Sequence, residues 1–215
     1  MLKAVIFDFD GTIADTVPLC IAACRAAFEP LAGRTFSDEE ITATFGPSEE
    51  GSVRALIPDH YEAGVAAYLT CYKKLHPMCP KPFDGIPALL HGLKQKGLII
   101  GLVTGKGRRS CDISLDAYGL ADVFDAIEAG SPEGPCKPRG IQTILRRFGL
   151  NGSEALYTGD VPSDITASRE AGVRIASAAW ASTADPKALA ACAPDAVCES
   201  IEAFAKYVED LLREN

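Results

Sequence analysis

The sequence predicts an α/β fold, in which a doubly wound parallel sheet forms the core and an all-helical domain is inserted into it. In residues 83–215, short and nearly continuous apolar runs alternate with segments of helical periodicity, which is typical of a parallel sheet covered by helices on both faces. Residues 15–82 show helical periodicity without a strand pattern, and they are far more numerous than a single crossover helix requires. We therefore expect an α/β core of residues 1–14 and 83–215 and a helical domain of residues 15–82.

Each predicted strand is a short apolar run, which indicates that it is buried on both faces of the sheet. The first run ends in acidic residues and Gly11. Strands are expected at residues 3–9, 98–104, 124–129, 155–159 and 174–179. Helical patterns lie between them at residues 86–96, 108–118, 138–148 and 163–171. The alternation of these elements predicts a single sheet with parallel strands.

The inserted segment carries its own helix signals. Thr16 and Pro18 suit the start of a first helix, and Ser37 with Glu40 fits a capping box at the start of another. Further along, apolar residues recur at helical spacing: Val65, Tyr68, Leu69, Tyr72 and Leu75. These signals predict several helices and no strand.

The chain returns from the inserted domain through a proline-rich segment. Pro77, Pro80 and Pro82 precede Gly85. Because proline restricts the backbone, we expect a stiff hinge strand here rather than a flexible linker.

Composition excludes several classes of protein. The 215 residues are 47% hydrophobic and 23% charged, with a mean hydropathy of +0.09, which excludes a disordered, collagenous or coiled-coil chain. A formal net charge of -8 argues against a broad basic surface for nucleic acid. The N-terminus resembles a buried strand rather than a signal peptide, and no apolar run reaches the roughly 18 residues of a membrane span. We expect a cytoplasmic protein, monomer or homodimer, with neither nucleic acid nor a membrane as partner.

The eight cysteines are scattered along a chain that has enough apolar residues to build a core without cross-links. We therefore expect reduced thiols. Structural zinc is not favoured, because Cys20 and Cys24 lie one helical turn apart, Cys192 and Cys198 are six residues apart, and no histidine is near either pair.

Two pairs of carboxylates follow predicted strands. Asp8 and Asp10 end the first strand, where alternation places both side chains on one side and Gly11 allows a sharp turn. Asp160 and Asp164 follow the strand at residues 155–159. Ligands of open α/β sheets bind at the carboxyl edge, and several carboxylates there repel one another unless a cation lies between them. Hard oxygen ligands of this kind predict a Mg²⁺ site.

Two further strand ends carry groups that can bind phosphate. The hydroxyl of Thr104 and the backbone amides of Gly105 and Lys106 can donate hydrogen bonds at a turn. Lys137 precedes Pro138, which suits the first turn of a helix, so its ammonium group is expected at a helix start. Together with the carboxylates, these groups predict a site for a phosphate ester and a metal ion.

Four motifs in this order carry a resemblance that covers essentially the whole chain: Asp8 to Thr12, Thr104, Lys137, and Asp160 to Asp164. They resemble the four motifs of the haloacid dehalogenase superfamily, in particular its phosphatases of the phosphoglycolate phosphatase type. The helical insertion is similar to the small helical cap of that family. The resemblance implies a Rossmann-type core, a cap over its carboxyl edge, and a phosphatase acting on a small phosphomonoester such as phosphoglycolate.

The resemblance also implies roles for individual residues. Asp8 would be the nucleophile that forms an aspartyl phosphate, and Asp10 the general acid and base. Mg²⁺ would be held by Asp8, the carbonyl of Asp10, and Asp160, with Asp164 supporting this shell through water. The phosphoryl group would be bound by residues of the matching motifs: Gly11, Thr12, Thr104, Gly105, Lys106 and Lys137.

Two other functions stay open at this point. A sugar phosphomutase of the β-phosphoglucomutase type has the same fold, and it needs cap residues that hold a sugar bisphosphate. A phosphate-responsive binding protein would use Asp8 as acceptor without turnover, although it would not need Asp10. The leaving group is expected to be read by the cap, with Pro47 and Arg54 as candidates, because the planar guanidinium group of Arg54 suits a carboxylate.

Overall fold

A computed structural model describes residues 1–213, and these contain one parallel sheet of six strands. The order across the sheet is β3-β2-β1-β4-β5-β6. The bounds are β1 (Ala4–Phe7), β2 (Ile99–Val103), β3 (Ala126–Glu128), β4 (Ala155–Thr158), β5 (Arg174–Ala178) and β6 (Ala196–Cys198). The chain adds β2 and β3 on one side of β1 and then returns to add the others on the opposite side, so the sheet is doubly wound, as predicted.

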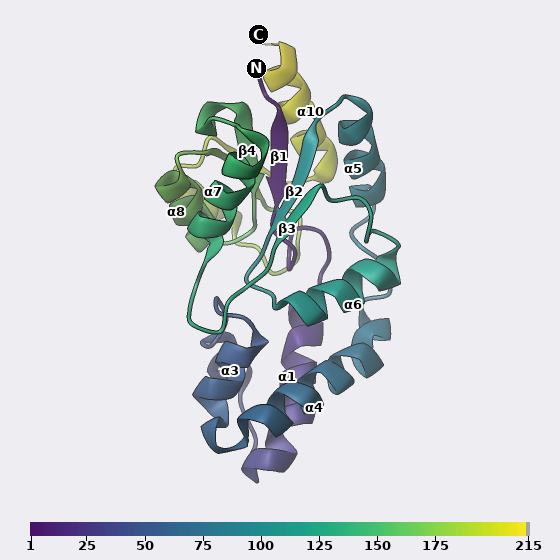
Figure 1. The fold of residues 1–215 in the computed structure, drawn as a ribbon, viewed down its shortest axis with the longest axis vertical. Helices are drawn as coiled ribbons and strands as arrows, with labels where there is room; N and C mark the ends of the chain where they lie inside the picture. The colour runs from purple at the N-terminus through teal and green to yellow at the C-terminus, as the bar shows by residue number, and fades with distance from the viewer. Residues whose placement is uncertain (214–215) are drawn as a thin grey trace.

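Helices cover both faces of the sheet (Figure 1). On one face lie α7 (Lys137–Phe148) and α8 (Pro162–Ala171), and on the other α5 (Ile86–Gln95) and α10 (Ile201–Arg213). The alternation along β1 explains this, because Ala4 and Ile6 pack into one buried cluster and Val5 and Phe7 into the other. The N-terminus and the end of α10 lie near the amino end of β1, and the carboxyl end of β1 points toward the other half of the molecule.

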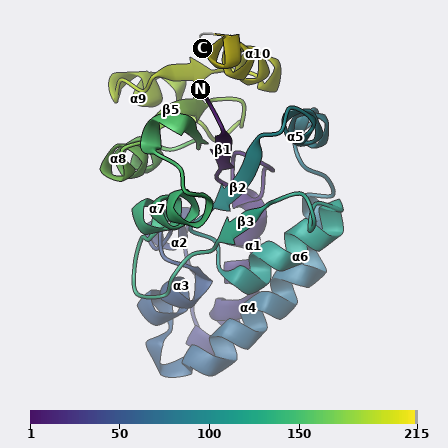
Figure 2. The same cartoon turned by 45° about the horizontal axis from the view of Figure 1, so that its top comes forward.

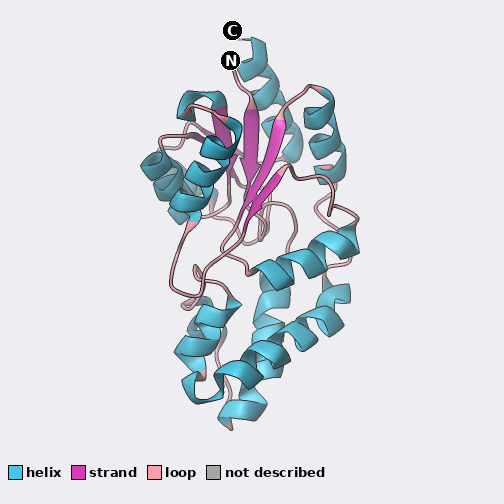
Figure 3. Ribbon diagram, in the orientation of Figure 1, coloured by secondary structure: helices cyan, strands magenta, loops and turns pink. Residues whose placement is uncertain are grey.

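The other half of the molecule contains only helices and loops in the described part of the chain (Figure 3). It is built from α1 (Val17–Ala32), α2 (Asp38–Thr42), α3 (Glu49–Leu56) and α4 (Tyr61–Leu75), with 3-10 turns at Pro58–His60 and His76–Met78. The capping box of Ser37 and Glu40 is present, which confirms that prediction. The boundary between core and cap remains a prediction.

Helix α6 (Arg108–Tyr118) follows β2 in the chain but runs beside α4 of the helical half (Figure 2). The hydroxyl of Tyr72 lies 2.8 Å from that of Ser114, and Nε2 of His76 lies 3.0 Å from the same hydroxyl. The two halves are therefore joined by a buried polar contact as well as by the chain crossings.

Three elements were not predicted from the sequence, namely the strand β6 and the helices α9 (Pro186–Ala191) and α10. The strand was missed because three residues leave little apolar periodicity. Thr16 is the N-cap residue of α1, as predicted, although its side chain makes no capping hydrogen bond. No helix in residues 1–213 has the length and apolar content needed to cross a membrane.

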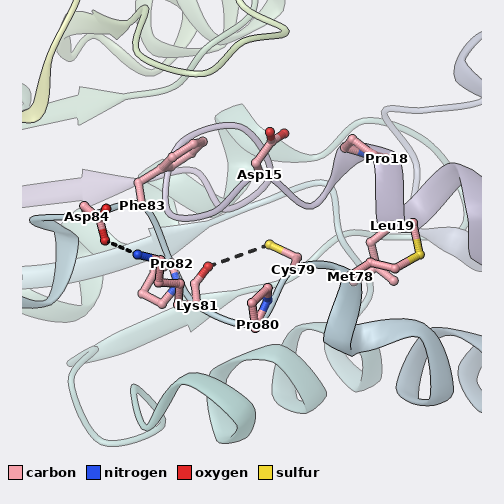
Figure 4. A pocket seen from close by; sticks show the side chains of 10 residues that line it. All are labelled: Asp15, Pro18, Leu19, Met78, Cys79, Pro80, Lys81, Pro82, Phe83 and Asp84. Carbon is pink, nitrogen blue, oxygen red and sulfur yellow. Dashed lines mark hydrogen bonds and ion pairs between the residues drawn. The ribbon is translucent and has the colours of Figure 1, made fainter.

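The predicted hinge strand is wrong. The return segment contains a 3-10 turn at His76–Met78 and then loop, with a hydrogen bond from the Phe83 amide to the Ile13 carbonyl (3.0 Å). Three prolines in this segment lack amide protons, so it cannot pair as a regular strand. A cavity of about 330 Å³ lies between this segment and the start of α1. Figure 4 shows the side chains that line it.

Candidate active site

The nucleophile predicted from the sequence lies at the end of β1. The amide of Asp8 donates to the Thr158 carbonyl (2.8 Å), which extends the sheet by one residue and fixes the backbone beside β4. Gly11 follows with φ +75°, and a Cβ at that position would lie 2.1 Å from Oδ2 of Asp160. Only glycine therefore allows the loop after β1 to approach the loop after β4 this closely.

Three carboxylates meet where the two loops approach. Asp8, Asp160 and Asp164 each have an oxygen within 4.8 Å of the other two, and all three are buried. Nζ of Lys137 donates to Oδ2 of Asp8 (2.8 Å) and to Oδ1 of Asp164 (2.5 Å). Oδ1 of Asp8 is buried without a hydrogen-bond partner among residues 1–213. Three carboxylates with a free oxygen are a donor set that fits Mg²⁺.

The electrostatics of this cluster favour a bound cation. Burial, opposed by Lys137 and reinforced by Asp164, raises the pKa of Asp8 to about 6. Burial together with Asp8 and Asp164 raises the pKa of Asp160 to about 8. Burial alone would lower the pKa of Lys137, but attraction to Asp164 and Asp8 raises it above its usual value. The single positive charge of Lys137 therefore does not neutralise the three carboxylates.

Asp164 holds Lys137 in place. It is fully buried at the start of α8, and its oxygens accept hydrogen bonds from the Tyr157 hydroxyl (3.1 Å) and the Val161 amide (3.2 Å). Because these donors fix the Asp164 carboxylate, they also fix the ammonium group of Lys137 beside Asp8.

Asp10 has different partners from Asp8. Its Oδ1 accepts hydrogen bonds from Nζ of Lys106 (3.0 Å) and from the Thr16 hydroxyl. The Lys106 side chain is only 2% exposed, and the attraction of Asp10 raises its pKa although burial acts in the opposite direction. The structure thus separates the two acids of the first motif, one with Lys137 and one with Lys106.

The remaining motif residues lie around the same loops. Thr104 is buried at the end of β2, and its hydroxyl accepts the Lys106 amide (3.1 Å). The Thr12 hydroxyl donates to Oδ1 of Asp160 (3.5 Å). Thr104 and Gly105 line the adjacent pocket, whereas Gly11, Thr12 and Asp164 are not among its lining residues.

A pocket of about 630 Å³ separates the sheet edge from the helical half. From the core it is lined by Asp8, Asp10, Thr104, Gly105, Lys106, Pro135, Lys137, Pro138, Asp160, Val161, Ser163, Thr166, Ala167 and Glu170. From the helical half it is lined by Val17, Cys20, Cys24, Phe45, Gly46, Pro47, Glu49, Ser52 and Tyr68. The predicted catalytic residues and the candidate Pro47 thus face one cavity.

Arg54 does not line this pocket. Its guanidinium group lies 5.2 Å from the centre of the Tyr61 ring, and the side chain is exposed on α3. Sequence reasoning missed Glu49, Cys20 and Tyr68, which do line it. The sequence does carry a signal for Glu49, because this acid follows Ser48 at the start of a predicted helix. An acid in the first turn of a helix is usually explained by the helix dipole, however, so the signal does not by itself indicate a pocket residue.

Comparison with known proteins identifies the family of this chain. The family model "Haloacid dehalogenase-like hydrolase" matches residues 5–178. The chain is 32% identical over 181 residues to a Clostridium perfringens protein named as a candidate pyrophosphatase PpaX, covering 81% of this chain and 82% of that protein. It is 26% identical over 224 residues to the phosphoglycolate phosphatase of Synechococcus elongatus, covering 99% and 100% of the two chains.

Solved structures share the fold. The crystal structure of a predicted phosphoglycolate phosphatase from Haemophilus somnus has a TM-score of 0.80 at 19% identity, over 96% of this chain and 98% of the other. A candidate β-phosphoglucomutase from Thermotoga maritima has a TM-score of 0.74 at 23% identity, over 97% and 99%. At these identities the similarity concerns the fold.

Proposed function

Because this chain belongs to the haloacid dehalogenase-like hydrolases, we propose that it is a Mg²⁺-dependent phosphatase that hydrolyses a small phosphomonoester through an aspartyl phosphate on Asp8. One observation carries the proposal. Asp8 lies at the carboxyl edge of the sheet, with one oxygen bound to Lys137 and the other buried without a partner, next to two further carboxylates.

The first chemical step is attack by a carboxylate oxygen of Asp8 on phosphorus. The bond between phosphorus and the leaving oxygen breaks as the bond to Asp8 forms, and Asp10 gives its proton to the leaving oxygen. In the second step water attacks phosphorus, Asp10 takes up a proton from this water, and the carboxylate of Asp8 is regenerated. Phosphate and an alcohol are the products.

The chain's own residues supply the positions for both steps. Lys137 is held by Asp164 and can stabilise negative charge on the phosphoryl oxygens. Thr104 and Gly105 line the same side of the pocket and are proposed to bind the phosphoryl group with it. Lys106 and Thr16 hold the Asp10 carboxylate at the pocket edge.

Mg²⁺ is proposed to be held by Asp8, Asp160 and the carbonyl of Asp10, with Asp164 in support. When bound, the ion would neutralise the repulsion between the carboxylates and the incoming phosphate. Residues 15–82 are proposed to act as a cap that excludes water and reads the leaving group.

The alternatives are less well supported. A phosphomutase has to hold a second phosphate on the cap side, whereas the two ammonium groups among the described lining residues, Lys106 and Lys137, are both paired with acids. A binding protein without turnover would not need Asp10 next to Asp8. All eight cysteines are free, which is compatible with the proposed location in the cytoplasm.

The test measures phosphate release from a panel of phosphomonoesters with Mg²⁺ and with a chelator. We expect turnover with Mg²⁺ only, and a covalent phosphoryl group on Asp8 in protein quenched during turnover. Release of phosphate from none of the esters would overturn the proposal, and transfer of phosphate between sugar positions would favour the mutase.

A further inference from the structure

The cap side of the active-site pocket contains an acid that the catalytic scheme does not use. Glu49 is the first residue of α3 and is only 7% exposed, yet it lines the pocket. Its Oε2 accepts a hydrogen bond from the Gly107 amide (2.7 Å), at the start of the core helix α6. Its Oε1 is buried without a hydrogen-bond partner in the described part of the chain.

The backbone at Gly107 leaves room for this close approach of the carboxylate. A Cβ on Gly107 would lie 2.5 Å from Oε2 of Glu49 and 2.6 Å from Oε1, so only the absence of a side chain allows the contact. A buried carboxylate oxygen without a donor raises the free energy of the folded state, because it has lost its hydrogen bonds to water and makes none to the protein. Glu49 lines the pocket, so a donor group on a leaving group bound there could satisfy this oxygen.

The charges around the pocket also disfavour an anionic leaving group. Its described lining contains five carboxylates, namely those of Asp8, Asp10, Glu49, Asp160 and Glu170. It contains two ammonium groups, those of Lys106 and Lys137, and each already pairs with an acid. No arginine lines it within residues 1–213. An anionic leaving group would thus meet Glu49 without a free cation to offset it.

From this arrangement we infer that Glu49 determines specificity, and that the natural leaving group is uncharged or cationic and carries an O–H or N–H donor. The inference rests on the proposed phosphatase function and narrows its substrate class. It selects phosphates of polyols, sugars or amino alcohols and disfavours glycolate and phosphate as leaving groups. Cys20, Cys24 and Tyr68 around the same pocket provide weakly polar surface for the carbon skeleton of such a group.

A second explanation is that Glu49 serves only to dock the cap. Its neighbours do dock, because Glu50 pairs with Arg109 (3.2 Å) and the Ser48 amide donates to the Ser131 carbonyl (3.0 Å). Glu49→Gln separates the two explanations. The amide oxygen of glutamine can still accept the Gly107 hydrogen bond, whereas the negative charge is lost.

The experiment uses the full-length protein with Mg²⁺ and four esters that differ in one group of a short leaving alcohol. These are 2-hydroxyethyl phosphate, phosphoethanolamine, propyl phosphate and 2-phosphoglycolate, which offer a hydroxyl, an ammonium, a methyl and a carboxylate group. The value of kcat/KM is measured for the parent, for Glu49→Gln, and for Glu50→Gln as a control with the same charge change in the same helical turn.

We expect the parent to prefer the hydroxyl and ammonium esters over phosphoglycolate by a factor of about 10 to 100. In Glu49→Gln, the ratio of phosphoethanolamine to phosphoglycolate should fall about tenfold or more, while Glu50→Gln should keep the parent ratio. Because the same ratio of two esters is compared between the parent and each variant, differences in the intrinsic reactivity of the esters cancel.

Two results would overturn the inference while leaving the phosphatase function intact. One is a parent enzyme that prefers phosphoglycolate, and the other is an equal effect of Glu49→Gln on all four esters, which assigns Glu49 to cap docking alone. Turnover of p-nitrophenyl phosphate by the parent shows that the phosphatase chemistry operates. Without turnover of any ester, the proposed function itself fails.

Discussion

Nζ of Lys106 lies 3.0 Å from Oδ1 of Asp10, and this ion pair joins the loop after β2 to the loop after β1 at the edge of the active-site pocket. The ammonium group also lies 4.4 Å from the centre of the Tyr72 ring, so helix α4 covers it. Lys106 is predicted to bind phosphate through its backbone amide, and that prediction stands beside this contact. The ion pair of its side chain gives the ammonium group a further role, which is to position Asp10.

Replacing Lys106 by methionine tests this role. Lys106→Met keeps the length and apolar stem of the side chain but removes the charge that holds Asp10. We expect kcat to fall about 10- to 100-fold while KM changes less than about threefold, because Asp10 acts on the leaving oxygen in the transition state. Lys96→Met, which removes a surface pair with Glu209, serves as control. A large rise in KM with unchanged kcat would show that the ammonium group of Lys106 binds substrate instead.

Asp8→Asn should abolish turnover and leave the fold intact. The amide has the shape of the carboxylate but is not a nucleophile, so we expect kcat to fall by a factor of about 1,000 or more. Stability should be unchanged or higher, because a buried acid with a raised pKa is removed and Lys137 keeps Asp164. Phosphate release and thermal unfolding measure the two effects. Normal turnover would disprove the nucleophilic role.

Activity should require Mg²⁺ and be suppressed by Ca²⁺. Calcium accepts the same oxygen ligands but takes more of them, and it can draw both oxygens of Asp8 away from attack. Asp160→Ala should raise the Mg²⁺ concentration for half-maximal activity more than Asp164→Ala, whose loss chiefly frees Lys137. Titration of activity with Mg²⁺ measures this. Full activity in a chelator would contradict the metal requirement.

Arg54→Met should have small and equal effects on different substrates. The guanidinium group lies over Tyr61 on an exposed face and does not line the pocket. We expect kcat/KM for phosphoglycolate and for p-nitrophenyl phosphate to change by less than about twofold. A loss confined to phosphoglycolate would show that Arg54 reads a carboxylate when substrate is bound.

His76 should make stability depend on pH. Burial, with a further contribution from Lys106, lowers its pKa below the ordinary value of 6.5. The unfolded chain therefore binds more protons below about pH 6.5, and the free energy of unfolding should fall as the pH drops from that value toward the lowered pKa.

Urea unfolding between about pH 8 and pH 5.5 measures this effect. His76→Gln should lose less stability over that range than the parent. His60→Gln, at an exposed position, should follow the parent curve. Parallel curves for the parent and His76→Gln would contradict the buried neutral histidine.

The sequence by itself determined the fold class, because buried parallel strands require apolar runs and the turns after them require glycine and acids. Five strands, and the presence of helices without strands in residues 15–82, were predicted correctly. Asp8 and Asp160 lie together because the carboxyl ends of parallel strands share one edge, and Lys137 at the start of α7 joins them there. The strand β6 was missed, since three residues carry too little pattern.

Only the tertiary structure decided which acid pairs with which lysine and what lines the leaving-group side of the pocket. The Asp10–Lys106 contact joins residues 96 apart in the chain, and the Glu49–Gly107 contact joins residues 58 apart. Such contacts depend on how the cap helices pack over the sheet edge, and no local period encodes that packing. For this reason the sequence indicated an arginine on α3 as the cap's recognition residue, whereas the folded chain turns Glu49 of the same helix toward the pocket.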